Sequence, residues 1–204
     1  MFVLTINQRD TAEATDRVDE LIAATAHLPA LRGFQRSWAD EAIGVFEDAP
    51  TAIDAALIAV RQRRWSIGIG AGPVLRPFPD DIREAEGYGL IYAREAVERA
   101  QASNERVPLA VVGLNEELAG EAQAVLKLLG QLVYTRTDAE WRVLDLLTPG
   151  VRGQYKAVAA ALGISVQAVS QSVRRSYWIQ EWESRPAAAR LLGWAGSGEH
   201  SFEY

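Results

Sequence analysis

The chain has 204 residues, of which 49% are hydrophobic, and it contains no cysteine. This length suffices for one large domain or two small ones, and the hydrophobic content excludes a disordered chain. The lack of thiols excludes a disulfide framework and a thiolate metal site. No run reaches the roughly 18 apolar residues that a membrane span needs, and no signal peptide is recognisable, so we expect a cytoplasmic protein without a membrane partner.

The formal net charge is −6, but the charged residues are unevenly distributed. Residues 1–133 carry a net charge of −7, whereas residues 134–190 carry +3. The distribution of charge matters more for nucleic-acid binding than its sum. The pattern therefore predicts an acidic front module and a mildly basic back module.

Short apolar runs and amphipathic segments alternate in the front half. They predict strands at residues 2–6, 34–37, 42–46, 65–70 and 109–112, helices at 12–27, 51–63 and 90–102, and a loop at 75–87. A central antiparallel sheet with helices on one face buries this pattern economically. We therefore predict an α+β fold whose first domain is a ferredoxin-like antiparallel sheet with helices.

The back half contains helical patterns only. A long helix at 116–133 is expected to link the halves, followed by helices at 138–147 and 186–194 that flank a helical pair. Thr137 and Glu140 form a capping-box pattern at the start of the first of these. The predicted domains are a sheet domain (1–115), a connecting helix (116–136), an all-α domain (137–195) and a flexible tail (196–204).

Residues 155–175 have the pattern of a helix-turn-helix. Ala159 is small enough for two helices to approach closely, and Gly163 stands where the first helix must stop. Ser165 is a good N-cap for the second helix. Val166, Val169 and Val173 are predicted to turn inward, the last two against Ala159 and Leu162.

The opposite face of the second helix carries polar side chains of the kinds that contact bases and phosphates. The candidate DNA-binding residues are Lys156, Ser165, Gln167, Ser170, Gln171, Arg174 and Arg175. The segment resembles the helix-turn-helix of many bacterial regulators and of sigma-factor DNA-binding regions. The alternative interpretation is an ordinary helical hairpin with a solvated face.

The front half resembles a nucleotide-cyclase-type domain over residues 1–112. The resemblance is carried by Asn7, by Asp40-Glu41 followed by Gly44-Val45-Phe46, by Trp65-Ser66-Ile67-Gly68-Ile69-Gly70-Ala71-Gly72-Pro73-Val74, and by Tyr92-Ala93-Arg94. In that family, two carboxylates on adjacent strands hold two divalent ions. The resemblance implies a paired domain with a nucleotide as candidate ligand.

Asn7 is neutral where the family has aspartate, so a hard cation loses an anionic ligand. We therefore predict that turnover is lost, that no cofactor is bound, and that Asp40 is the remaining candidate metal ligand. The alternative for Asp40 is simple turn chemistry. For Gly68, Gly70 and Gly72 the alternative to phosphate binding is close packing of a strand against a helix.

The combined layout resembles the SatD family of bacterial proteins, several of which are labelled MarR-like regulators. The likeness is carried by Leu4-Thr5-Ile6-Asn7-Gln8-Arg9, by Trp65-Ser66-Ile67-Gly68-Ile69-Gly70, and by Ile164-Ser165 with Gln167-Ala168-Val169-Ser170-Gln171. It covers nearly the whole chain and implies more about the fold than about the function.

For the histidines and for two tryptophans near the end of the chain, we expect no part in a functional site. His27 and His200 are far apart in sequence and suggest no metal or catalytic pair. Trp178 and Trp182 are placed at the end of the recognition helix, where they form an apolar stripe that gathers the last helix.

We expect a homodimeric transcription regulator that binds double-stranded DNA through its back domain and is not an enzyme. The first alternative is a metal-dependent nucleotide cyclase or nucleotide-binding signalling enzyme. The second is a protein-interaction module that uses the helix-turn-helix as a scaffold.

Overall fold

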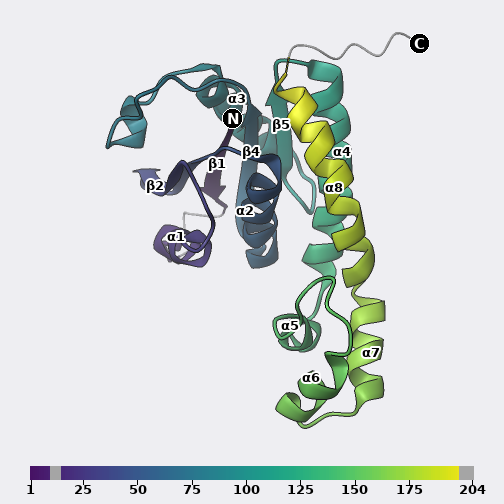
Figure 1. The fold of residues 1–204 in the computed structure, drawn as a ribbon. Helices are drawn as coiled ribbons and strands as arrows, with labels where there is room; N and C mark the ends of the chain where they lie inside the picture. Colours follow the sequence, from purple (N-terminus) through teal and green to yellow (C-terminus); the bar gives the residue numbers. More distant parts are fainter. Residues whose placement is uncertain (10–14, 198–204) are drawn as a thin grey trace, which may run out of the picture.

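The computed structural model describes residues 1–9 and 15–197, and it shows the predicted α+β fold with one five-stranded sheet (Figure 1). The strands are β1 (Phe2–Gln8), β2 (Arg32–Trp38), β3 (Glu41–Phe46), β4 (Trp65–Ala71) and β5 (Leu109–Gly113). The helices are α1 (Val18–Thr25), α2 (Ala49–Gln62), α3 (Tyr88–Ala102), α4 (Glu116–Thr135), α5 (Asp138–Leu144), α6 (Tyr155–Leu162), α7 (Val166–Arg175) and α8 (Trp178–Ala195), with a short 3₁₀ turn η1 (Ile82–Glu84) in the predicted loop. The predicted helix start at residues 12–14, His200 and the predicted tail from residue 198 lie outside the described residues.

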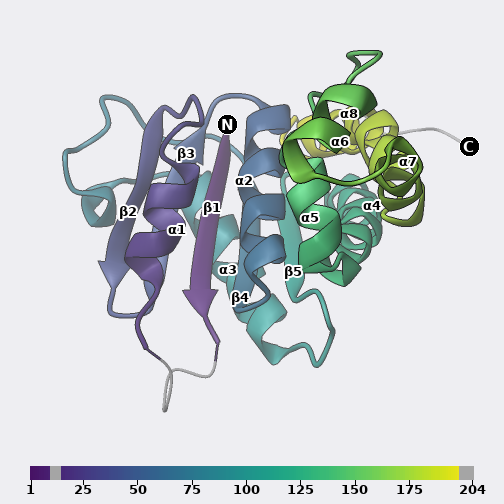
Figure 2. The ribbon, with the colours of Figure 1, turned by 90° about the horizontal axis from the view of Figure 1, so that it is seen from below.

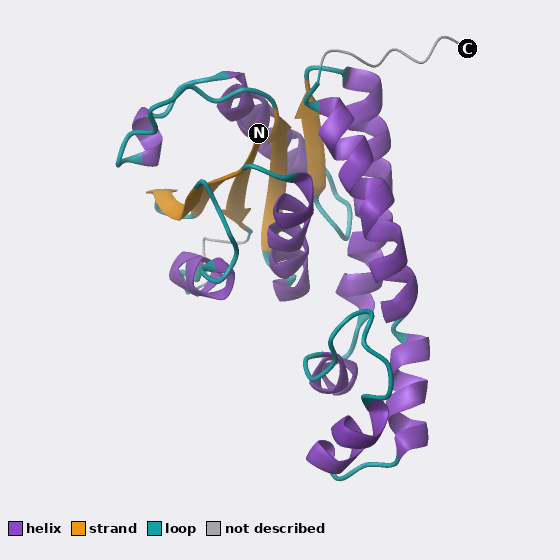
Figure 3. Ribbon diagram, in the orientation of Figure 1, coloured by secondary structure: helices purple, strands orange, loops and turns teal. Residues whose placement is uncertain are grey.

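The strand order in the sheet is β2-β3-β1-β4-β5. Strand β1 lies antiparallel between β3 and β4, with Leu4 opposite Gly44 and Ile69, and β2 pairs antiparallel with β3. The prediction of a purely antiparallel sheet was wrong, because β5 pairs parallel to β4 (Figure 3). The reason is the connection: α3 lies between these strands in the chain and crosses over the sheet, as parallel pairing requires.

Helices cover both faces of the sheet, not one face as predicted. Leu4 and Ile6 of β1 point into the main core with α1, α2, α4 and α8. Val3 of the same strand points to the opposite face, where it packs with Ala93 of α3. Because side chains alternate along a strand, the continuous apolar run of β1 reflects burial on both sides. That two-sided burial explains why β1 does not show simple apolar–polar alternation.

The glycines of β4 serve close packing. A Cβ atom on Gly68 would lie 2.3 Å from the backbone nitrogen of Val97, and one on Gly70 would lie 2.2 Å from the carbonyl oxygen of Gly89. Both contacts are with α3, so this helix lies directly on the strand backbone. The packing alternative for these glycines is therefore confirmed.

We expect Gly68→Ala to lower the free energy of unfolding by about 1–3 kcal/mol, because backbone atoms of α3 cannot move aside easily. Urea denaturation followed by circular dichroism measures this change. The matched control is Gly33→Ala in β2, where an added Cβ meets nothing within 4 Å. Equal stability of the Gly68→Ala variant and the parent protein would contradict the close approach.

Helix α1 is shorter than predicted and starts at Val18. The side-chain nitrogen of Gln8 donates to the carbonyl of Thr15 (3.0 Å), and its oxygen accepts from the backbone nitrogen of Arg17 (2.8 Å). Residues 15–17 are therefore tied to the end of β1 in a non-helical conformation, which an apolar periodicity cannot reveal.

The last helix begins earlier in the chain than predicted. Helix α7 ends at Arg175, and α8 runs from Trp178 to Ala195, so Trp178 and Trp182 belong to α8 and not to the recognition helix. Tyr177, with a φ of 51°, turns the chain between them. Pro186 was interpreted as a helix start but lies inside α8. The helix continues through it because Ala188, Leu192 and Ala195 are fully buried in the main core.

Helices α4 and α8 run antiparallel beside the β5 edge, and α5, α6 and α7 extend beyond their far ends (Figures 1 and 2). The backbone nitrogen of Asn115 donates to the carbonyl of Ala195 (3.1 Å) at one end of this pair. Within residues 1–9 and 15–197, no helix combines the length and hydrophobicity of a membrane span.

A buried ion pair joins the end of α4 to α8. Arg136, at the end of α4, is 2% exposed and lies 2.7 Å from the carboxylate of Glu181 in α8, which is 1% exposed. Arg136 also donates to the carbonyl of Ser176 at 3.1 Å. Burial lowers the pKa of Arg136, and the charge of Glu181 opposes that shift. On the surface nearby, Arg61 of α2 makes two hydrogen bonds of 2.7 Å to Asp145, just after α5.

Candidate nucleic-acid interface

Helices α5, α6 and α7 share a small apolar core of their own. Its buried residues are Val143, Leu144, Leu147, Val158, Ala159, Val169 and Val173, with Trp141, Tyr155, Leu162 and Trp178 packed around them. The predicted capping box at the start of α5 is confirmed. The side chain of Thr137 accepts a hydrogen bond from the backbone nitrogen of Glu140, and the carboxylate of Glu140 accepts one from the backbone nitrogen of Thr137. As predicted, Val169 and Val173 share this core with Ala159, and Leu162 packs against it.

The turn between α6 and α7 follows the local signals in the sequence. Gly163 has a φ of 65°, the left-handed conformation that favours glycine at a helix end. The backbone nitrogen of Ile164 donates to the carbonyl of Ala159 at 3.0 Å. Ser165 caps α7, since its hydroxyl accepts from the backbone nitrogen of Ala168 at 3.1 Å. These contacts determine the direction in which α7 leaves the turn.

The inner face of α7 consists of Val169, Ser172 and Val173, which are at most 9% exposed. The prediction that Val166 turns inward was wrong, because this side chain is 46% exposed. Val166 is the first residue of α7 and lies a turn before the packed part of the helix, and it lines the groove described below. Ser172 is the buried residue that the apolar pattern missed.

The predicted DNA-binding residues are all exposed on one part of the surface. They are Lys156 near the start of α6, the cap Ser165, and Gln167, Ser170, Gln171, Arg174 and Arg175 of α7. Arg175 has an acidic neighbour, with its Nε 3.9 Å from a carboxylate oxygen of Glu140. Lys156 and Arg174 have no ion pair with any residue in the described ranges. Two cations and three uncharged polar side chains on α6 and α7 are thus free to meet an anionic partner.

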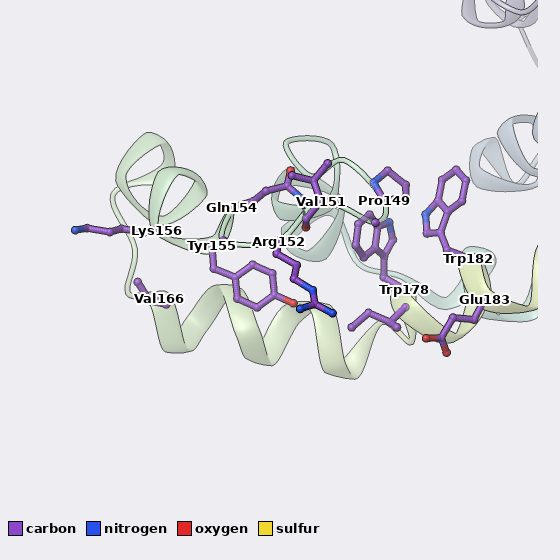
Figure 4. Close-up of a pocket in the computed structure, with 13 residues that line it drawn as sticks. Pro149, Val151, Arg152, Gln154, Tyr155, Lys156, Val166, Trp178, Trp182 and Glu183 are labelled. Atoms are coloured by element: carbon purple, nitrogen blue, oxygen red, sulfur yellow. Dashed lines mark hydrogen bonds between the residues drawn. The ribbon is translucent and has the colours of Figure 1, made fainter.

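An aromatic groove beside this surface was not predicted. Its volume is about 650 Å³, and it lies between the loop at residues 149–154, the start of α6 and the α7–α8 junction (Figure 4). Its walls include Tyr155, Val166, Trp178, Ile179 and Trp182. The spacing of the two tryptophans was visible in the sequence, but the loop that faces them is more than 20 residues earlier in the chain.

The residues that carry the cyclase resemblance include Asn7 and Glu41, which lie on the α3 face of the sheet. Glu41 lies opposite Asn7 in the β1–β3 register, and Asp40 lies in the turn just before it. Glu41 is 3% exposed and accepts from the hydroxyl of Ser37, while Arg94 of α3 lies 3.4 Å away. The side-chain oxygen of Asn7 is buried without a hydrogen-bond partner. The carboxylate beside Asn7 is therefore that of Glu41, and it already has a cation beside it.

A metal centre has little support from the surrounding groups. In the part of the chain that the structure describes, no three His, Asp or Glu side chains lie close enough together to hold a metal ion. The backbone carbonyl of Asp40 accepts a hydrogen bond from the backbone nitrogen of Gln8 at 2.8 Å.

Comparison of the chain with protein-family models, with curated proteins and with solved structures gave no match.

Proposed function

We propose that the protein is a transcription regulator that binds double-stranded DNA, with α6 and α7 acting as a helix-turn-helix. The observation that carries the proposal is the division of α7 into two faces. Val169 and Val173 are at most 2% exposed, whereas every predicted base- or phosphate-contacting residue is on the solvent side. A helix held by its own small core and presenting an exposed polar arc is suited to enter the major groove.

The side chains on this arc have distinct roles in the proposal. Glutamine amides at 167 and 171 match the donor and acceptor pair of adenine, and the guanidinium of Arg174 matches guanine. Lys156, Ser165, Ser170 and Arg175 are placed to contact phosphates, which position the protein without reading sequence. The overall negative charge does not prevent this, because the acidic residues are concentrated in residues 1–133.

The sheet domain has a non-catalytic role in this proposal. We propose that β1–α1–β2–β3–α2–β4 is a ferredoxin-like unit, extended by α3 and β5, of a cyclase-like domain that has lost its metal chemistry. Asn7 supplies no charge, and Glu41 is already beside Ser37 and Arg94. We propose that this domain pairs two chains, so that two copies of α7 reach half-sites about 34 Å apart.

A nucleotide-binding enzyme is the second candidate, favoured by one observation. The buried side-chain oxygen of Asn7 has no hydrogen-bond partner, and a catalytic role is one explanation for such a group. An assay for cyclic-nucleotide formation from ATP or GTP with Mn²⁺ separates the two candidates, since only the enzyme accumulates product.

The DNA proposal predicts different effects for two substitutions on the same surface. Gln171→Ala should lower discrimination at one base pair by about 1–3 kcal/mol, because a bidentate contact is lost. Lys156→Ala should weaken binding to all sequences alike and reduce the slope of log affinity against log salt by about one. Fluorescence anisotropy with DNA fragments selected by the purified protein, over a range of salt concentrations, measures both.

The matched control is Gln180→Ala, which removes an exposed glutamine of α8 outside this surface. It should change neither affinity nor preference. If Gln171→Ala, Arg174→Ala and Lys156→Ala all behave like this control in folded protein, α7 is not the reading helix.

A further inference from the structure

The loop that precedes α6 holds a cation beside the proposed DNA surface. Arg152 is exposed and forms no ion pair with another residue in the described part of the chain. In Figure 4, Arg152 and Tyr155 point toward α7, whereas Lys156 points away from them at the far end. Arg152 and Tyr155 line one groove with Val166, the first residue of α7. The tip of this loop therefore lies beside the end of α7 at which the polar arc begins.

Hydrogen bonds hold this loop in one conformation. The side-chain nitrogen of Gln154 donates to two carbonyl oxygens of the loop, at 2.7 and 2.9 Å. Its side-chain oxygen accepts from the backbone nitrogen of Thr148 at 2.8 Å. Gly150 and Gly153, with φ values of 76° and 79°, turn the chain on either side of Arg152. Because the loop is already ordered, binding through Arg152 costs less conformational entropy than binding through a mobile segment.

The two flanks of the polar arc on α7 differ in charge. With 3.6 residues per turn, Arg175 lies on one flank of the arc and Ser170 on the other, beside Val166. A helix in the major groove has a phosphate backbone on each side. Arg175 supplies a cation toward one backbone, but neither Ser170 nor Val166 is charged. Arg152, which shares a groove with Val166, supplies the missing cation on the second flank.

We infer that Arg152 and Tyr155 bind the phosphate backbone on that second side of the major groove, an inference that rests on the proposed DNA-binding function. The guanidinium of Arg152 can pair with phosphate oxygens through two parallel hydrogen bonds. The hydroxyl of Tyr155 makes no hydrogen bond to another described residue, and tyrosine is among the side chains that donate to phosphates. Glu183, the acidic residue of the groove, lies near Trp182 (Figure 4). Since the partner is the backbone, this patch adds affinity without sequence preference.

Fluorescence anisotropy of the full chain with DNA fragments that the purified protein selects, over a range of salt concentrations, tests the inference. Arg152→Gln should weaken binding about fivefold and reduce the slope of log affinity against log salt by about 0.9, with sequence preference unchanged. Tyr155→Phe keeps the ring and loses only the hydroxyl, so it should weaken binding about threefold without changing the slope. The matched control is Arg190→Gln, which removes the same charge from an exposed position on α8 and should bind like the parent protein.

Ethylation interference locates the contact on the DNA. We expect one phosphate whose ethylation weakens binding of the parent protein but not of Arg152→Gln. If Arg152→Gln and Tyr155→Phe bind like Arg190→Gln while Gln171→Ala still lowers discrimination, the inference is wrong and the proposed role of α7 stands. A change of sequence preference in Arg152→Gln would overturn the assignment to phosphates. A parent protein that binds no DNA would overturn the inference together with the proposed function.

Discussion

Glu181→Ala is expected to lower the free energy of unfolding by about 3–5 kcal/mol, because it leaves a buried guanidinium without its counter-charge. Glu181 is 1% exposed and lies 2.7 Å from Arg136, which is itself 2% exposed. It also pairs with Arg185, whose second partner is Asp54 of α2. Urea denaturation followed by far-ultraviolet circular dichroism measures the loss.

Two further variants test the cause of this loss. Glu183→Ala removes an exposed carboxylate two residues away and should change stability by less than about 0.5 kcal/mol. The double replacement of Arg136 by Met and Glu181 by Leu should recover much of the loss, since a buried pair can be exchanged for apolar groups at little net cost. A single Glu181→Ala variant as stable as Glu183→Ala would show that the pair contributes nothing.

Val169→Asp is expected to cost about 4 kcal/mol or more and to unfold the helices around α7, because it buries a carboxylate without a partner. Val169 is fully buried at the centre of the α5–α7 core, among Val143, Val158 and Val173. Hydrogen exchange should lose protection in α6 and α7, and urea denaturation should give the overall loss.

The control for this prediction is Val166→Asp, one turn earlier in the same helix. Val166 is 46% exposed and occupies the first position of α7, where an acidic side chain interacts favourably with the helix dipole. We expect its stability to remain within about 0.5 kcal/mol of the parent protein. Similar losses in the two variants would show that burial of Val169 is not the cause.

Features determined by neighbouring residues could be predicted from the sequence. The capping box of Thr137 and Glu140, the left-handed Gly163 and the cap of Ser165 all formed as predicted. Each depends on contacts within a few residues, so the residue types alone carry the information. The exposed positions of Gln167, Gln171 and Arg174 follow in the same way from helical periodicity once Val169 and Val173 are buried.

Other features depended on residues that are distant in the chain. The parallel pairing of β5, the cover of α3 on the second face and the passage of α8 through Pro186 are decided by packing between separate elements. Competing arrangements share the same local patterns, so periodicity cannot choose between them.

The sequence by itself therefore determined the α+β class, the small-residue turn between α6 and α7, and the polar arc that we propose reads DNA. Only the tertiary structure decided that Glu41 lies opposite Asn7, that Arg136 and Glu181 share a buried pair, and that the loop at 149–154 faces the tryptophans of α8. The physical reason is the range of the interactions. Caps and helical faces are made within one or two turns of chain, whereas ion pairs and grooves form only when folding brings separate segments together.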